Sequence, residues 1–487
     1  MTAPVPLDVD VLVVGAGLSG VDAACRLAKH CPDTVWAVLE ARDAIGGTWD
    51  LFRYPGVRSD SDMYTLGFPF RPWRGNGSFA TAGEIRRYVR ETADEFGVTE
   101  RLHLGQRVER LEWSSQDARW TVTARTSSGV VEHRARLVYL ATGYYDYDAG
   151  HVVPFAGLDD FAGPVVHPQE WPEDLDVRGA RVVVIGSGAT AVTLVPALVR
   201  EGAAHVTMLQ RSPSYVAALP DRDVVADALH RVLPDRAAHH AVRAKNVALS
   251  VLAYQALRRW PRAGARLLRK RVAERLPEGY DVGTHFTPRY DPWDQRLTVA
   301  PDGDLLDDLA AGTASVVTDT VERFEREGVR LGSGELVPAD VVVTATGLVL
   351  RLGGGAEAVV DGRAVDIAAG HVYKGLMLSD VPNLAMAVGY SNASWTLRAD
   401  VSARWFCGLV RYLDRKGLSV ATPRFDEERV GTSDRPLLDL TSGYVLRGAH
   451  LLPRQGRRRP WRVVQSYPYD LAVMRLGRYD DGHLELR

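Results

Sequence analysis

Two glycine-rich segments have the spacing that holds the pyrophosphate of a dinucleotide. The first runs from Gly15 to Gly20 as GAGLSG, and the second from Gly186 to Ala191 as GSGATA. In this pattern the first glycine permits a tight turn, the second lets the backbone approach the phosphates, and the third position needs a small residue for packing. The N–H groups and positive dipole end of the following helix then face the phosphates. Two such segments predict a flavin site and a nicotinamide site, and hence hydride chemistry.

The surroundings of the first segment predict a site for FAD or NAD. An apolar run at Val9–Val14 predicts a buried parallel strand, Val21–Lys29 a helix, and Val35–Leu39 a second strand. Glu40 follows that strand, where a carboxylate accepts hydrogen bonds from a ribose diol and repels a 2′-phosphate. The structural alternative is a glycine turn that binds nothing. We expect this site to be lined by Gly15, Gly17, Ser19, Gly20, Glu40, Gly47, Thr48, Trp49, Arg58, Asp60, Val108 and Trp395, although Trp395 is equally compatible with a core position.

Cations replace the acid in the second segment. The strand Val182–Ile185, the helix Val192–Val199 and the strand Val206–Leu209 are followed by Gln210-Arg211-Ser212. A guanidinium and a hydroxyl suit a 2′-phosphate, so this pattern predicts NADPH in preference to NADH. Alternatively, Arg211 is an ordinary surface arginine. We expect the site to be lined by Gly186, Ser187, Gly188, Ala189, Thr190, Ala191, Arg211 and Ser212.

The elements between these motifs predict an α/β fold with two Rossmann-like dinucleotide-binding domains, for FAD and for NADP. Residues 119–125 and 130–137 alternate like a hairpin, and the strands before Ala141-Thr-Gly143 and Ala345-Thr-Gly347 close the two domains. A basic, alanine-rich stretch predicts a helical insertion in the NADP domain. The expected domains are 1–145 (first part of the FAD domain), 146–380 (NADPH domain, with the insertion at about 222–290) and 381–487 (C-terminal part of the FAD domain).

Composition excludes several other classes of protein. A length of 487 residues predicts two to three domains, and a formal charge of −2 argues against a nucleic-acid binder. The three cysteines, Cys25, Cys31 and Cys407, form no CxxC pair. This pattern argues against a disulfide scaffold, a metal site and a dithiol redox centre.

Nothing in the sequence predicts a targeting signal or a membrane span. Residues 1–10 have no basic n-region or cleavage site, and the longest apolar run, Val247–Leu257, is shorter than the roughly 20 residues that cross a bilayer. We therefore expect a cytoplasmic protein. The basic stretch Arg222–Arg275 and the run Arg454–Arg462 are compatible with peripheral membrane contact or with solvated helix faces.

A charge-rich loop follows the first site. It contains Arg53, Arg58, Asp60 and Asp62, and it is either a solvated ion-pair loop or a place where Asp60 holds a catalytic cation. Far along the chain, Arg296 ends a proline- and aspartate-rich loop and is followed by a strand-like run. Spacing alone gives that arginine no role.

Two longer patterns connect the chain to a known family. The connector Phe161–Pro172 reads FxGxxxHxxxWP, with His167 and Trp171 at its histidine and tryptophan positions, and Gly46–Asp60 reads GGxWxxxxYPGxxxD. With the two glycine segments, they make the chain resemble the class B flavoprotein monooxygenases, and specifically the Baeyer–Villiger monooxygenases, over nearly its whole length. Within that family, several stretches look closest to the ethionamide-activating mycobacterial type.

The resemblance implies an FAD-dependent, NADPH-consuming oxygenation. It implies that a C4a-peroxyflavin formed with O₂ inserts oxygen beside a ketone carbonyl to give an ester or lactone, with sulfoxidation as a side activity. Arg296 matches the family's active-site arginine, which stabilises anionic oxygen, and Asp60 matches the carboxylate that positions it. Arg211 and Ser212 match the 2′-phosphate contacts. Gln295 stands where many relatives have a lysine for that phosphate, which weakens the expected discrimination against NADH.

Rival functions differ in how well the residues fit them. A disulfide reductase needs a cysteine pair that the sequence lacks. A class B enzyme that hydroxylates nitrogen or oxygenates sulfur remains open, although Arg296 favours ketones. A non-enzymatic FAD-binding scaffold is disfavoured by the presence of Asp60, Arg296 and both glycine segments. For His167 and Trp171 we expect a mechanical role, as a hinge between the two nucleotide domains, rather than acid–base chemistry.

Overall fold

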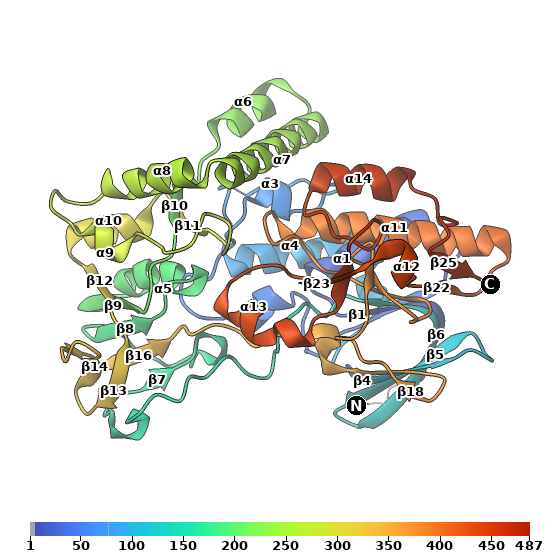
Figure 1. The fold of residues 1–487 in the computed structure, drawn as a ribbon, viewed down its shortest axis with the longest axis horizontal. Coiled ribbons are helices and arrows are strands. Elements are labelled where there is room, and N and C mark those ends of the chain that lie inside the picture. The colour runs from blue at the N-terminus through green and yellow to red at the C-terminus, as the bar shows by residue number, and fades with distance from the viewer. Residues whose placement is uncertain (1–4, 76) are drawn as a thin grey trace.

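The computed structural model describes residues 5–75 and 77–487, which form two α/β halves side by side (Figure 1). In the first half, β1 (Asp8–Val14) lies parallel between β2 (Trp36–Leu39) and β6 (Gly129–Leu140) in an 11-stranded sheet. β1 and β2 carry buried apolar side chains, as their uninterrupted valine and leucine runs predict. The strands predicted at these positions are confirmed to within two residues.

An antiparallel meander extends this sheet on one side. β4 (Arg107–Ser114) pairs with β5 (Arg119–Thr126), which pairs with β6, so the predicted hairpin is confirmed. On the other side β3 (Leu102–His103) follows β2. Two helices pack together against the sheet, α1 (Leu18–His30) and α11 (Trp395–Lys416). Further helices of this half are α2 (Thr48–Leu51), α3 (Met63–Leu66), α4 (Ala82–Glu95), α12 (Glu427–Val430), α13 (Gly443–Gly448) and α14 (Tyr467–Leu476).

The second half contains a five-stranded, wholly parallel sheet in the order β12-β9-β8-β16-β7. Its central strand β8 (Arg181–Ile185) precedes the second glycine segment, and α5 (Ala189–Arg200) follows it. The other strands are β7 (Val165–Val166), β9 (His205–Gln210), β12 (Ala314–Thr318) and β16 (Val341–Thr344), and α10 (Asp304–Ala311) packs beside α5. A small antiparallel sheet of β13 (Val321–Glu325), β14 (Gly328–Leu331) and β15 (Leu336–Pro338) caps this half.

A helical layer occupies the stretch expected to be an insertion. It comprises α6 (Val224–Val232), α7 (Asp235–Arg259), α8 (Pro261–Ala273) and α9 (Val282–His285), of which α6 to α8 run along the top of Figure 1. α7 also contacts the first half, because the buried Arg243 donates to the carbonyls of Tyr64 at 2.7 Å and Gly67 at 2.8 Å. Two strands flank the layer, β10 (Val216–Leu219) and the parallel β11 (Thr298–Pro301).

The chain returns to the first sheet earlier than expected. β17 (Glu357–Val360) pairs with β4, so the return precedes the expected boundary at residue 381. Strands of two to four residues carry too little pattern to reveal which sheet they join, because pairing is decided by tertiary contacts. The remaining short strands of this half are β18 (Arg363–Ala364), β19 (Val372–Tyr373), β20 (Met377–Leu378), β21 (Leu384–Met386), β22 (Ala421–Pro423), β23 (Thr432–Pro436), β24 (Arg454–Gly456) and β25 (Leu484–Leu486).

Candidate functional site

The first glycine segment forms a turn that only glycine can adopt. Gly15 has φ +105°, and a Cβ there would lie 2.6 Å from the Ala141 carbonyl oxygen. A Cβ on Gly20 would lie 1.8 Å from the Gly15 oxygen. Gly17 is the N-cap of α1, where no described side chain caps the helix and the first turn holds no acid. The free N–H groups and the dipole of this helix therefore fit a bound pyrophosphate.

Glu40 and the Gly47 loop border this turn. The Glu40 carboxylate accepts from the N–H of Ala16 at 2.6 Å and of Arg42 at 2.9 Å, and burial raises its pKa. Each oxygen retains a further lone pair for a ribose hydroxyl. A Cβ on Gly47 would lie 2.9 Å from the Gly17 Cα, so the two loops touch. Of the other expected residues, Thr48 accepts from the Tyr145 hydroxyl, Trp49 is half-buried on α2, and Val108 is buried on β4.

Trp395 joins the C-terminal segment to the first site. As the first residue of α11 it donates from Nε1 to Ser19 Oγ at 2.8 Å. Its ring stacks on Tyr144, with centroids 5.0 Å apart and planes 18° from parallel. Tyr144 directly follows the Ala141–Gly143 turn at the end of β6, so an aromatic pair lies beside the glycine segment.

The second glycine segment repeats the first turn with more open space. Gly186 has φ +148°, and a Cβ there would lie 2.5 Å from the Ala345 oxygen. Gly188 is the uncapped N-cap of α5, and a Cβ there would meet no atom within 4 Å. Ser187 Oγ lies 2.9 Å from Ser214 Oγ and donates to the Ser212 carbonyl at 3.1 Å. Ala189, Thr190 and Ala191 form the first turn of α5.

Two arginines stand near this segment. Arg211 is exposed after β9, next to the exposed Ser212. Arg447 of α13 donates to the Leu348 carbonyl at 3.5 Å, in the turn that follows β16. Burial and the nearby Arg211 both lower the pKa of Arg447, so the two guanidinium groups repel each other. Neither makes a salt bridge within residues 5–75 and 77–487. Two neighbouring cations that form no salt bridge with an acid suit a phosphate dianion.

An ion pair joins the two halves between these sites. Arg296 Nε lies 2.6 Å from Asp60 Oδ2 and Nη2 lies 3.0 Å from Oδ1, and Nη2 also donates to Ser61 Oγ at 3.2 Å. Burial alone lowers the pKa of Arg296, but the Asp60 carboxylate outweighs it, so the pKa is raised overall. Tyr144 and Tyr444 also lie close enough to raise it. The guanidinium is therefore a permanent positive charge with a fixed orientation.

The loops that carry this pair are anchored to both halves. Arg296 precedes β11. In the same loop the Asp294 carboxylate accepts from Arg258 of α7 at 2.6 Å, and the Asp294 backbone carbonyl accepts from the Thr441 N–H at 2.9 Å. On the other side, Tyr54 belongs to the core of the second half, and burial raises its pKa to about 12. A Cβ on Gly56 would lie 2.6 Å from the Ala197 Cβ of α5.

Arg58, which we expected at the cofactor, forms an ion pair between the two halves. Its two terminal nitrogens contact Asp304 of α10 at 2.6 Å and 3.1 Å. A place for Arg58 at the cofactor stays a prediction. Sequence reasoning missed the contact with Asp304 because the two residues stand far apart in the chain and neither is a fixed position of a motif.

The connector Phe161–Pro172 forms an edge of the second half. Its strand β7 pairs with β16, and a Cβ on Gly163 would lie 2.1 Å from the Asp340 oxygen. His167 Nδ1 accepts from the Gln169 N–H at 3.2 Å, and burial lowers the pKa of His167. Trp171 packs against the core around α5. A hinge role for His167 and Trp171 remains a proposal.

Three residues near the two sites carried no sequence signal. Arg447 lies in an arginine-containing C-terminal helix with no motif, and the two tyrosines had no recognisable spacing. Only the absence of an acid at the second site could have drawn attention to a cation this far along the chain. The residues missed are Tyr144, Tyr444 and Arg447.

Comparisons with known proteins extend these observations. The family model for an NAD(P)-binding Rossmann-like domain matches residues 13–75, and the model for L-lysine 6-monooxygenase/L-ornithine 5-monooxygenase matches residues 78–230. The chain is 50% identical to the FAD-containing monooxygenase EthA of Mycobacterium tuberculosis over 97% of this chain and 96% of that protein. It is 48% identical to the putative FAD-containing monooxygenase MymA of the same species, over 98% and 97%.

The fold has close counterparts among solved structures. An oxidized steroid monooxygenase bound to NADP superposes with a TM-score of 0.77 at 22% identity, covering 98% of this chain and 99% of that one. At that identity the likeness concerns the fold. It agrees with the two Rossmann-like halves described above.

We predict that Gly188→Asp weakens dinucleotide binding at the second site without lowering the stability of the protein. The new carboxylate would enter open space and cap α5, which stabilises a helix by about 1 kcal/mol. It would also occupy and repel the position of a phosphate. Titration with 2′,5′-ADP should show that the affinity falls about a hundredfold. Thermal unfolding should show an unchanged or higher melting temperature. Gly188→Ala shows the effect of the Cβ without the charge, and unchanged affinity of Gly188→Asp would contradict the assignment.

Proposed function

Because the chain belongs to the family of FAD-containing monooxygenases, we propose that it is a Baeyer–Villiger enzyme that uses FAD and NADPH. Its reaction inserts one oxygen atom of O₂ beside a ketone carbonyl and gives an ester or lactone. Sulfide oxygenation is a secondary activity. The observation that supports this proposal best is the Asp60–Arg296 pair, in which two hydrogen bonds fix a guanidinium across the contact between the two halves.

The residues present fit both cofactors. The uncapped N-termini of α1 and α5 offer free N–H groups for two pyrophosphates, whereas α4 begins with a complete capping box at Thr81 and Glu84. Glu40 suits a ribose without a 2′-phosphate at the first site. When bound, FAD and NADPH supply hydride transfer and the activation of O₂.

Arg296 supplies electrostatic stabilisation. Attack on a ketone places negative charge on the carbonyl oxygen, and a preorganised guanidinium stabilises that charge without reorganisation. Asp60 holds the planar group through two parallel hydrogen bonds, which leaves its remaining N–H groups for substrate. The raised pKa keeps Arg296 protonated throughout the neutral and mildly alkaline range.

We predict that Arg296→Ala leaves the reduction of the flavin by NADPH intact but prevents the oxygenation of the ketone. FAD content and the anaerobic rate of flavin reduction by NADPH should stay within about twofold, and ester formation should fall at least a hundredfold, roughly the effect of removing one oxyanion donor. Stopped-flow absorbance measures the first step. Chromatography of ¹⁸O-labelled products from a panel of linear and cyclic ketones measures the second.

Arg53→Ala is the matched control for that variant. Arg53 lies in the same loop as Asp60 but is 53% exposed, and its contact with Glu173 is at the surface, so the substitution should change neither step. Normal ester formation by Arg296→Ala would refute the role of the arginine. A wild-type enzyme that oxygenates amines or sulfides but none of the ketones would favour the nitrogen- or sulfur-oxygenating alternative.

The coenzyme preference rests on three side chains. Arg211 and Ser212 follow β9, and Arg447 of α13 lies near enough to Arg211 for that charge to lower its pKa. We propose that the second arginine supplies the positive charge that Gln295 lacks. A 2′-phosphate between two guanidinium groups relieves their mutual repulsion and satisfies their donors.

Substituting Arg447 tests this preference. Arg447→Gln should raise KM for NADPH about tenfold and leave KM for NADH nearly unchanged, because only NADPH carries the 2′-phosphate. Steady-state NAD(P)H oxidation measures both constants. Arg435→Gln, at an exposed arginine of β23, is the control. An equal rise for both coenzymes would place Arg447 elsewhere on the dinucleotide.

The helical layer supports peripheral contact with an anionic membrane. No helix described between residues 5 and 487, residue 76 aside, is long and apolar enough to cross a bilayer. Yet Leu249, Leu252, Trp260 and Leu267 of α7 and α8 and their junction are each more than half exposed. The same two helices carry exposed arginines and lysines, and this combination suits the interface of an anionic bilayer.

Vesicle co-sedimentation tests this contact. Wild-type protein should sediment with phosphatidylglycerol-containing vesicles more than with pure phosphatidylcholine, because anionic lipid attracts the basic helices. The double variant Leu252→Ser/Trp260→Ser should lose about tenfold in partitioning, as buried apolar area is lost. Leu476→Ser, at an exposed leucine of α14, is the control. Binding that ignores these substitutions would exclude α7 and α8 as the contact.

A further inference from the structure

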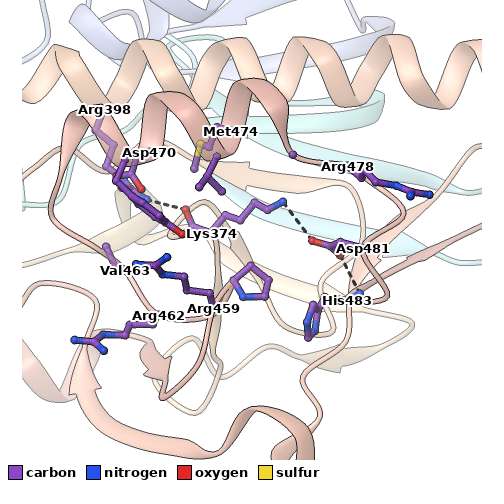
Figure 2. Close-up of a pocket in the computed structure, with 14 residues that line it drawn as sticks. Lys374, Arg398, Arg459, Arg462, Val463, Asp470, Met474, Arg478, Asp481 and His483 are labelled. Atoms are coloured by element: carbon purple, nitrogen blue, oxygen red, sulfur yellow. Dashed lines mark hydrogen bonds and ion pairs between the residues drawn. The ribbon is translucent and has the colours of Figure 1, made fainter.

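One cavity of the protein is lined by neither residue of the Asp60–Arg296 pair. It has a volume of about 340 Å³ and is bordered by α14, by the Lys374 turn and by the segments 459–463 and 477–483 (Figure 2). None of the residues described above at the two glycine segments lines it. This volume falls within the range of small-molecule sites in proteins, roughly 300–1,000 Å³.

The charged groups inside the cavity are already paired. Lys374 crosses it and ends with Nζ 3.3 Å from Asp481 Oδ2, and burial lowers the pKa of Lys374 (Figure 2). Arg398 contacts Asp470 and donates to the Lys374 carbonyl at 2.7 Å. Two cations are thus paired with two carboxylates, so these four groups add no net charge to the interior of the cavity.

The mouth of the cavity carries the unbalanced charge. Arg459 and Arg462 are exposed, and neither forms a salt bridge among the described residues. Arg459 lies with Cζ 4.0 Å from the centroid of the Tyr469 ring, which holds its guanidinium at the rim. Both residues belong to the segment 459–463, which forms one border of the cavity (Figure 2). Two surplus positive charges at one rim create a site for an anion.

The wall beyond this rim is largely apolar. Val463, Val473 and Met474 contribute to it, and Met474 is buried. A fully polar anion would leave these surfaces in contact with water, whereas a hydrocarbon chain would cover them. The ligand that matches both features is an anion with an apolar tail.

We propose that this cavity binds an aliphatic carboxylate, with its carboxylate between Arg459 and Arg462 and its chain against Val463, Val473 and Met474. Guanidinium groups bind carboxylates through paired, charge-assisted hydrogen bonds. The cavity also borders Arg398 of α11, the helix whose first residue, Trp395, donates to Ser19 of the first glycine segment. This site does not depend on the proposed oxidation.

Calorimetric titration of the FAD-loaded, full-length enzyme with monomeric decanoate tests the proposal. Wild-type protein should bind decanoate but not decyltrimethylammonium, which has the same chain and the opposite charge. Arg459→Gln/Arg462→Gln should weaken decanoate binding about tenfold, and high salt should weaken it for the wild type. Val473→Trp should abolish binding by filling the cavity without changing charge.

Arg454→Gln is the matched control, because this exposed arginine belongs to the same basic run but does not line the cavity. It should bind decanoate like the wild type, and all four proteins should oxidise NADPH at the same rate. Undiminished decanoate binding in the arginine double variant and in Val473→Trp would overturn the proposal. So would an absence of decanoate binding together with binding of phosphatidylglycerol vesicles that is lost in Arg459→Gln/Arg462→Gln, because the two arginines would then be a membrane contact.

Discussion

The Asp60–Arg296 pair sets the constraint that the rest of the molecule satisfies. Its two residues come from different halves, so the pair exists only while those halves keep one relative position. A partly buried ion pair contributes little net stability, because desolvation offsets most of the attraction. Its value is geometric: two parallel hydrogen bonds fix the plane of the guanidinium.

The surrounding contacts supply that relative position. Tyr54 inserts into the core of the second half, and Arg58 pairs with Asp304. Arg243 joins α7 to two carbonyls, one within α3 and one directly after it. Tyr54 also lies within hydrogen-bonding reach of Thr190, so one of these contacts borders the second glycine segment. The contacts that hold the halves together thus lie directly beside that site.

Sequence patterns predicted what is local. The glycine segments, the strands around them and the hairpin of β5 and β6 follow from periodicity and from conformations that only glycine adopts. Arg296 was singled out through a family resemblance, since an arginine before a strand has no signal of its own. The contacts of Arg58 with Asp304 and of Arg447 near Arg211 depend on the packing of distant segments, which spacing does not encode. The pairing of β17 with β4 was not predicted for the same reason.

The order of the strands also dictates the order in which a growing chain is completed. The C-terminal end of β6 pairs with β1 on one side and receives its second parallel neighbour only from β21. Ser19 receives the indole of Trp395, and both β21 and Trp395 follow the whole second half. The residues of the second parallel sheet are contiguous by comparison, from β7 to β16. On the ribosome the second half therefore has all its strands while the first still presents an unpaired edge. Closure of the first glycine segment is then a late event in biosynthesis, and the nascent chain depends on protection of that edge until α11 has emerged.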